Sequence, residues 1–376
     1  MKNLTVMLKP ASSACNLRCR YCFYADVSRS RSQYSYGMMS EDTADALLKN
    51  IFSFLEAGDS LCLSFQGGEP TLAGLDFFRR FVDIAAQKNA SIGVRLTWAL
   101  QTNGLLIDED WCAFLREHRF LVGLSMDASP ELHDRNRIDA GGKGTWRRVR
   151  QARLLLEKYG IEYNVLAVLT SEMARHSRQV WDFIQRENIE YLQLIPCLGE
   201  LDAETRSPYA LTPKRFASFY TQRFTYWYEG YQKGAYRSVK LFDDLVNLLA
   251  AGIQSACGMT GECVPQLVVE ADGSVYPCDF YMTDEYRLGN LAEQALSEIF
   301  ASPAREAFCR RAHRQPRLCA DCRYRSICGG GCKRMQQEVC CSENDDTCGY
   351  QDFLDRCLPG LQRIAAAVQR RSYRSF

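Results

Sequence analysis

The octapeptide Cys15-Asn16-Leu17-Arg18-Cys19-Arg20-Tyr21-Cys22 decides how this chain is interpreted. Its cysteines have the spacing C-x3-C-x2-C, and the next cysteine along the chain is Cys62. A four-iron cluster ordinarily takes four thiolates. Three thiolates leave one iron with an open position, and open metal positions are where catalysis takes place. We therefore predict a catalytic [4Fe–4S] cluster on Cys15, Cys19 and Cys22; a zinc knob or a chance grouping is the alternative.

Strand and helix patterns alternate on both sides of this loop. Residues 4–9 alternate in polarity and form the expected first strand, so the loop follows a strand directly. Further β-rich runs are found at 61–65, 93–100, 120–126, 163–169 and 189–195, with helical patterns between them. Six such units in about 200 residues predict an α/β fold, a partial (β/α)6 barrel of the TIM type with ligands at the carboxyl ends of its strands.

The amino-acid composition changes twice in the rest of the chain. Residues 208–254 are rich in aromatic residues and helical in pattern, and we interpret these aromatics as core rather than as a substrate-stacking surface. From Cys257 onward the sequence is rich in cysteine and glycine, which indicates a small module stabilised by metal. Eight of its cysteines have ligand-like spacing, enough for two four-thiolate clusters. These eight are Cys257, Cys263, Cys278, Cys319, Cys322, Cys328, Cys332 and Cys348.

Composition narrows the class of protein. The chain has 376 residues with a net charge of +1, which gives no electrostatic reason to expect nucleic acid or a membrane as partner. No signal peptide or membrane-spanning run is apparent. Eighteen cysteines in such a chain point to metal binding, because disulfides are disfavoured in a reducing compartment. We expect a cytoplasmic monomer whose scattered cysteines, such as Cys112 and Cys197, behave as small apolar residues.

The ends of the predicted strands carry glycine and polar groups. Gly67-Gly68-Glu69-Pro70 follows the second strand, where glycines permit close approach of a ligand and the carboxylate can accept a hydrogen bond from an ammonium group. Gln101-Thr-Asn-Gly104 and Ser125-Met-Asp127 end the next two strands. Each of these motifs alone is as well explained by an ordinary turn.

The cysteine loop after a first strand, with an aromatic residue before its third cysteine, resembles the radical S-adenosylmethionine (SAM) superfamily. The resemblance implies that the open iron binds SAM and that reductive cleavage of SAM yields a 5′-deoxyadenosyl radical. It also implies which residues surround SAM, with Glu69 at its amino group and Arg137 at its carboxylate. The predicted cofactor-binding residues are Tyr24, Gln66, Gly67, Gly68, Glu69, Ser125, Arg137 and Leu198.

The C-terminal cysteines resemble the SPASM module of peptide-modifying radical SAM enzymes; a zinc ribbon is the alternative. The resemblance implies interleaved ligands for two auxiliary [4Fe–4S] clusters, which spacing alone leaves open. Cluster I would take Cys257, Cys263, Cys278 and Cys332, and cluster II would take Cys319, Cys322, Cys328 and Cys348. Cys340 and Cys341 are alternatives to Cys348. The implied domains are a radical SAM partial barrel at 1–207, a helical linker at 208–254, a SPASM domain at 255–349 and a C-terminal helix at 350–376.

Longer motifs narrow the family. Those at 9–13, 35–39, 64–75, 100–104, 120–127 and 275–281 resemble anaerobic sulfatase-maturating enzymes over nearly the whole chain. The resemblance implies oxidation of a peptidyl Cys or Ser to Cα-formylglycine through abstraction of a Cβ hydrogen, with Asp279 as general base. It implies an unfolded sulfatase peptide of the Cys/Ser-x-Pro/Ala-x-Arg type as partner and a flavodoxin or ferredoxin as reductant. Ala128-Ser129 departs from the glycine common in this family.

Three alternatives remain at this point. Asp279 immediately follows a predicted ligand, and a carboxylate there is either a base or an ordinary turn residue. A radical SAM maturase of a ribosomal peptide, forming a thioether or an epimer, would share every cluster motif. An iron–sulfur electron carrier would not need an open iron or the Gly-Gly-Glu-Pro motif, so the three-cysteine loop disfavours it.

Overall fold

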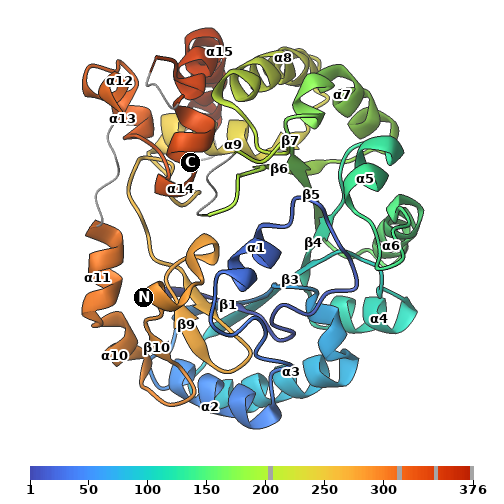
Figure 1. Ribbon diagram of the computed structural model, residues 1–376, viewed down its shortest axis with the longest axis vertical. Coiled ribbons are helices and arrows are strands. Elements are labelled where there is room, and N and C mark those ends of the chain that lie inside the picture. The colour runs from blue at the N-terminus through green and yellow to red at the C-terminus, as the bar shows by residue number, and fades with distance from the viewer. Residues whose placement is uncertain (202–205, 311–315, 343–345, 373–376) are drawn as a thin grey trace. The chain divides into compact units, whose positions relative to one another are not determined.

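The computed structural model describes residues 1–201, 206–310, 316–342 and 346–372 (Figure 1). Up to residue 196, helices separate each strand from the next along the chain. The chain forms two compact units. The first consists of Met1–Met126, His133–Asn164 and Pro265–Arg311. The second consists of Asp127–Leu132, Val165–Val264 and Ala312–Phe376. Each unit is therefore assembled from segments that are distant in sequence.

The first unit contains the first four predicted strands. They are β1 (Asn3–Leu8), β2 (Ser60–Phe65), β3 (Arg95–Thr102) and β4 (Leu121–Ser125), each pairing in parallel with the next. Their buried positions alternate along each strand, as expected where helices cover one face. The predicted strand positions are correct to within about two residues at each end, which is the usual uncertainty of strand limits.

A second group of strands extends this sheet. β8 (Leu267–Val269) pairs in parallel with the free edge of β1, and β9 (Ser274–Tyr276) and β10 (Gly289–Asn290) follow in antiparallel order. The order within the unit is β10-β9-β8-β1-β2-β3-β4. Strands of only two or three residues are too short to show an alternating pattern, which is why the sequence predicts a metal-stabilised module here and not an extension of the sheet.

Helices of the first unit pack their apolar stripes on the sheet. Side-chain caps start two of them, because Ser40 accepts from the backbone of Thr43 and Asp108 from that of Trp111. Phe78 of α3 packs against Phe65 with ring centroids 4.7 Å apart. The helices are α1 (Phe23–Arg29), α2 (Glu41–Phe52), α3 (Leu75–Asn89), α4 (Glu109–Glu117), α6 (Trp146–Lys158), α10 (Leu296–Phe300) and α11 (Pro303–Arg310), and α5 (Pro130–Asn136) begins in the second unit.

The second unit holds most of the fifth predicted strand, whose first two residues belong to the first unit, together with the sixth strand and a helical layer. β5 (Tyr163–Leu169), β6 (Tyr191–Pro196) and β7 (Ser238–Val239) are parallel and adjacent in that order. Its helices are α7 (Ser177–Arg186), α8 (Pro213–Gln232), α9 (Lys240–Ala251), α12 (Arg317–Ala320), α13 (Arg325–Cys328), α14 (Lys333–Met335) and α15 (Gly349–Ser372).

Most of the aromatic residues of α8 are core, as predicted, whereas Tyr226, Tyr228 and Tyr231 are half-buried. Phe219, Tyr220 and Trp227 are almost completely buried, and Phe353 of α15 packs against Tyr220 with ring centroids 6.0 Å apart. Burial of each such side chain contributes about 1.5–3 kcal/mol. Over the described residues, no helix combines the length and apolarity required to cross a membrane.

Candidate active site

The cysteine loop lies between β1 and α1 in the first unit. Cys22 is the N-cap residue of α1, and the backbone N–H of Leu17 donates to Sγ of Cys15 at 3.4 Å. The middle of the loop is tied to the segment after α5, because Arg18 donates to the carbonyl of Ile138 at 2.7 Å. The loop is thus fixed at its centre as well as at its two ends.

The Gly67-Gly68-Glu69-Pro70 segment holds the chain immediately before the first cysteine. Gly68 donates its backbone N–H to the carbonyl of Ser12 at 2.9 Å, and Glu69 donates to that of Ala14 at 2.8 Å. A Cβ atom on Gly68 would lie 2.1 Å from the Ala14 carbonyl oxygen, so this close approach requires glycine. The glycines therefore shape the cluster loop, and a backbone cradle of this kind fits a cofactor bound beside it.

The Glu69 carboxylate is buried and bonded to protein. Its oxygens accept from the Thr71 hydroxyl at 2.7 Å, the Thr102 hydroxyl at 2.7 Å and the Asn103 backbone at 2.7 Å. Burial raises the pKa of Glu69, and these hydrogen bonds oppose the rise. Glu69 thus braces the end of β3 in this structure, and its direct contact with the SAM amino group stays a prediction.

Asn103 connects that brace to the cluster loop. Its side-chain amide donates to Oδ1 of Asn16 at 2.7 Å and lies 3.9 Å from Sγ of Cys15. The sequence marks Gln101-Thr-Asn-Gly104 as a strand-end motif but does not distinguish Asn103 within it. Its position beside the first cysteine becomes visible only in the structure.

Arg137 and Ser125 lie in the same unit as the loop. The Arg137 guanidinium is 5.5 Å from the ring centroid of Tyr21, the residue before the third cysteine, and Ser125 is buried at the end of β4. His133 precedes Arg137 by one helical turn, and its Nε2 lies 3.1 Å from the Thr145 hydroxyl. Burial, with a smaller effect of Arg137, holds the pKa of His133 well below its usual range.

The segment that carries Asp279 packs against α1. Phe280 contacts Phe23, the residue after Cys22, with ring centroids 5.0 Å apart. Nζ of Lys9 lies 2.6 Å from Oδ1 of Asp279 and 4.2 Å from the ring centroid of Tyr24. The structure therefore places the predicted base in contact with a lysine that the sequence includes only as part of a longer motif.

Tyr24 and Gln66 occupy different surroundings. The Tyr24 hydroxyl donates to the Glu270 carboxylate, which also receives a hydrogen bond from Arg31 at 2.6 Å. Gln66 is half-buried and reaches Ser64 at 3.4 Å. No sequence signal marks Glu270, a single acidic residue after a three-residue strand. Leu198 lies in the second unit, two residues after β6, and is buried there.

Two C-terminal loops of the second unit meet backbone to backbone. A Cβ atom on Gly258 would lie 2.7 Å from Cβ of Cys332, so glycine is required next to Cys257. This contact brings the segment with Cys257 and Cys263 against Cys332, three of the four residues predicted for cluster I. The fourth, Cys278, belongs to the first unit.

The residues predicted for cluster II all lie in the second unit. An isolated β-bridge pairs Cys341 with Cys348. The interaction with the Cys341 thiol lowers the pKa of Cys348, whereas burial raises the pKa of Cys340 well above its usual range. The structure thus places Cys341 beside Cys348, and the choice of Cys348 as the fourth ligand of cluster II stays a prediction.

Two of the three scattered cysteines are buried thiols, as expected. Burial raises the pKa of Cys112 to about 11 and that of Cys197 to about 12, and Cys62 is half-buried. Among the described residues, no three His, Cys, Asp or Glu side chains are gathered so as to hold a single metal ion. The predicted groups are thiolate sets for iron–sulfur clusters, in which the protein ligands are shared among several irons.

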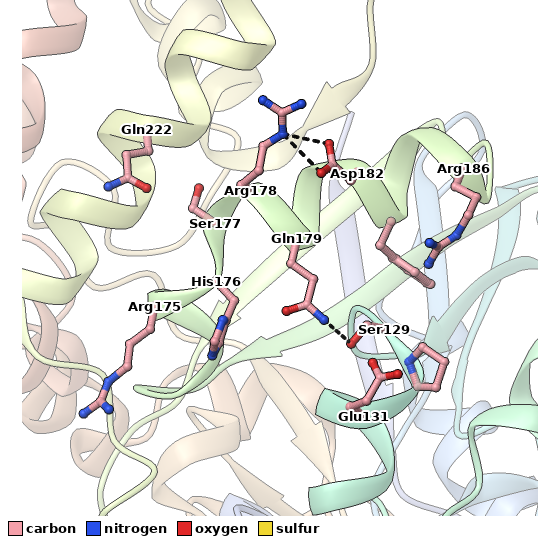
Figure 2. Close-up of a pocket in the computed structure, with 12 residues that line it drawn as sticks. Ser129, Glu131, Arg175, His176, Ser177, Arg178, Gln179, Asp182, Arg186 and Gln222 are labelled. Atoms are coloured by element: carbon pink, nitrogen blue, oxygen red, sulfur yellow. Dashed lines mark hydrogen bonds and ion pairs between the residues drawn. The ribbon is translucent and has the colours of Figure 1, made fainter.

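A cavity of about 680 Å³ lies elsewhere in the second unit, among α5, α7 and α8 (Figure 2). Figure 2 shows two interactions among its side chains: Arg178 pairs with Asp182 at 2.9 Å, and Gln179 donates to Ser129 at 3.2 Å. Its lining includes none of the predicted cofactor residues. It is therefore distinct from the set of residues around the cysteine loop.

Comparisons with known proteins agree with this fold and site. The family model described as the Radical SAM superfamily matches residues 10–176, and that described as SPASM, an iron–sulfur cluster-binding domain, matches residues 263–323. Fold and site thus define a radical SAM enzyme with a SPASM module, and the predicted fold class is confirmed.

Individual relatives narrow the class. A cysteine-type anaerobic sulfatase-maturating enzyme of Clostridium perfringens is 40% identical over 98% of this chain and 100% of its own length. A serine-type enzyme of Klebsiella aerogenes is 31% identical over 94% of this chain and 85% of its own. The structure of native anSMEcpe with bound AdoMet and Cp18Cys peptide matches with a TM-score of 0.88, at 37% identity, over 97% of this chain and 99% of that one. The chain belongs to the family of anaerobic sulfatase-maturating enzymes.

Proposed function

We propose that this protein oxidises a cysteine or serine in a sulfatase peptide to Cα-formylglycine. The observation that carries the proposal is the packing of the Asp279 segment on the cluster loop, where Phe280 contacts Phe23 immediately after Cys22. A carboxylate so placed is available to a peptide whose reacting carbon lies beside the loop. Membership of the family supplies the reaction class.

The chain's own residues divide the work. Cys15, Cys19 and Cys22 would hold the cluster that, with SAM, supplies the radical chemistry needed to take one hydrogen atom from Cβ of the substrate residue. Asp279 accepts the proton of the substrate thiol or hydroxyl. Loss of a further electron completes a two-electron oxidation, giving the aldehyde from serine, or from cysteine a thioaldehyde that water converts to the aldehyde and hydrogen sulfide.

The predicted residues give the cofactors their sites. Gly67 and Gly68 would present backbone to SAM, with Ser125, Arg137, Leu198, Tyr24, Gln66 and Glu69 around it. Arg137 supplies the cation for the SAM carboxylate. Cys257, Cys263, Cys278 and Cys332 would hold auxiliary cluster I, and Cys319, Cys322, Cys328 and Cys348 would hold cluster II. Such clusters would supply an exit for the second electron, which a redox-neutral reaction would not need.

The partners follow from the reaction. We expect an unfolded peptide with a Cys-x-Pro-x-Arg type of motif as substrate and a flavodoxin- or ferredoxin-type protein as electron donor. A cysteine peptide is the first to test, because the cysteine-type relative is more similar than the serine-type one. Location in the cytoplasm, the monomeric state and the four domain limits at 1–207, 208–254, 255–349 and 350–376 belong to the same proposal.

Peptide mass spectrometry tests the proposal. The anaerobically reconstituted enzyme is incubated with SAM, reductant and matched peptides carrying Cys, Ser or Ala at the reacting position. We expect the cysteine peptide to exchange sulfur for oxygen and to lose two hydrogens, and the alanine peptide to be unchanged. Asp279→Asn should still cleave SAM but form at least about tenfold less product. SAM cleavage by the wild type with no aldehyde from any such peptide would favour a ribosomal-peptide maturase.

A further inference from the structure

Lys9 and Asp279 form an ion pair at the end of the first strand. The ammonium lies 2.6 Å from Oδ1, and the two side chains are 1% and 15% exposed. Oδ1 itself is buried and has no hydrogen-bond partner among the described residues, so the lysine charge is what stabilises it. The 15% of the Asp279 side chain that is exposed therefore lies on its atoms other than Oδ1.

Strand register brings Lys9 to this place. Lys9 is the first residue after β1, and its backbone N–H donates to the carbonyl of Val269, the last residue of β8. The backbone N–H of Gln66, the first residue after β2, donates to the carbonyl of Leu8. The carboxyl ends of β2, β1 and β8 thus lie side by side, with Lys9 between Gln66 and Glu270. The lysine stem also passes close to Gly67, where an added Cβ would lie 3.1 Å from Cβ of Lys9.

Tyr24 supports the ammonium from its other side. Nζ of Lys9 lies 4.2 Å from the centre of the Tyr24 ring, a favourable cation–π distance. The Tyr24 hydroxyl is itself held by Glu270, and Glu270 by Arg31. The Glu270 and Arg31 side chains are both fully buried. A tyrosine anchored in this way keeps its ring, and with it the ammonium, in one position.

The charges of this group balance. Two cations, Lys9 and Arg31, alternate with two anions, Asp279 and Glu270, and buried charges of this kind persist when they are paired. Because the ammonium contacts both the ring of Tyr24 and the Asp279 carboxylate, Lys9 is confined in a way that an exposed lysine is not.

We propose that Lys9 is a positioning residue for Asp279, holding Oδ1 so that Oδ2 faces the thiol or hydroxyl of the substrate. The inference rests on the proposed role of Asp279 as base. The substrate proton goes to Oδ2, and Lys9 exchanges no proton in the step. Fixing one oxygen removes rotation of the carboxylate before the substrate arrives, and such preorganisation is a large part of catalysis.

Three variants test the inference. Lys9→Met removes the charge but keeps the stem, Lys9→Arg keeps a cation, and Lys88→Met removes a lysine from another Lys–Asp pair of the same unit, at 2.7 Å from Asp45. Each is reconstituted anaerobically, and its iron content is measured. Each then receives SAM and a cysteine peptide deuterated at Cβ, and formylglycine is counted per 5′-deoxyadenosine formed.

We expect Lys9→Met to keep its iron and to transfer deuterium to 5′-deoxyadenosine, but to form at least about tenfold less formylglycine per 5′-deoxyadenosine. Lys9→Arg should recover most of this ratio, and Lys88→Met should equal the wild type. A crystal structure of Lys9→Met should show the Asp279 carboxylate turned away from its wild-type orientation.

The inference is overturned if the ratio is unchanged in Lys9→Met, or if the carboxylate keeps its orientation there. A parallel loss of iron, deuterium transfer and product would also overturn it, because Lys9 would then support the fold alone. If the wild type cleaves SAM but forms no formylglycine, the proposed function fails, and the crystallographic comparison still decides whether Lys9 positions Asp279.

Discussion

The backbone N–H of Asn103 donates to Oε2 of Glu69 at 2.7 Å, and the side chain of the same asparagine donates to Asn16 in the cysteine loop. The two contacts form a continuous connection from the end of β2, through the end of β3, to the residue after Cys15. The acidic residue of the Gly-Gly-Glu-Pro motif therefore acts on the cluster loop through Asn103.

Glu69→Gln should weaken both the loop and SAM binding. The NH2 group of the new glutamine is a donor, and it would face the hydroxyl and backbone donors that now bond to the Glu69 carboxylate. Each hydrogen bond to a charged group that is lost in this way costs about 1.5–3 kcal/mol. We expect at least a tenfold weaker affinity for SAM in equilibrium binding, together with a lower midpoint of thermal unfolding. Glu109→Gln, which alters an exposed pair with Lys158, is the control. Weaker SAM binding at unchanged thermal stability would contradict the bracing of the loop by Glu69 and leave contact with SAM as its only role.

Substitution by methionine should change the free energy of unfolding in opposite ways at two buried arginines, Arg31 and Arg223. Arg31 is paired with Glu270 at 2.6 Å, so Arg31→Met leaves a buried carboxylate without its cation and should destabilise the protein by about 3–5 kcal/mol. Arg223 is also buried, but its guanidinium nitrogens have no hydrogen-bond partner among the described residues and it lies over the rings of Trp181 and Phe219.

Burial lowers the pKa of Arg223 to about 9, which shows the cost of keeping its charge there. Arg223→Met should therefore be neutral or stabilising by about 1 kcal/mol, because replacing a buried charge by an apolar side chain of similar length often stabilises. Thermal unfolding of the two variants beside the wild type measures the contrast. Equal destabilisation by both substitutions would contradict this explanation.

His133 should make stability depend on pH. Its folded-state pKa lies well below the unfolded value of 6.5, so below that value the unfolded chain binds a proton that the folded chain does not. The free energy of unfolding should decrease as pH falls from about 6.5 towards the folded pKa, by about 1.4 kcal/mol per pH unit. His133→Gln should flatten this dependence, whereas His118→Gln controls for loss of a histidine. An unchanged slope in His133→Gln would refute the assignment.

Iron content should distinguish Cys348 from its neighbour. Cys348→Ala removes the predicted fourth ligand of cluster II and should cost the protein about four irons. Cys341→Ala removes the thiol beside it and should retain close to the wild-type iron content. The measurement is iron and sulfide per chain after anaerobic reconstitution. The opposite pattern would transfer the ligand role to Cys341.

The sequence predicts the repeating part of the fold well, because long amphipathic helices and alternating strands leave a periodic pattern. All six strands predicted between residues 4 and 195 are found, but β7, β8, β9 and β10 are not foreseen, since strands of two or three residues carry no period. Pairing of β8 with β1 cannot be derived from local patterns either, because it joins residues about 260 positions apart.

The residues of the candidate site also fall into two groups, those that the sequence identifies and those that only the structure identifies. Cysteines are readily identified because their spacing is itself the signal. Lys9, Asn103, Arg31 and Glu270 become visible only when strand register brings them together. A single charged residue at a strand end resembles any solvated residue until its burial and partner are known.

Transfer of deuterium from substrate to 5′-deoxyadenosine tests the central claim most directly. Two cysteine peptides are compared, one deuterated at Cβ and one at Cα of the reacting residue. Oxidation to formylglycine predicts deuterium in 5′-deoxyadenosine from the Cβ-labelled peptide alone, with aldehyde formed in the same reaction. Deuterium from the Cα-labelled peptide, with a thioether or an epimer as product, would contradict the account.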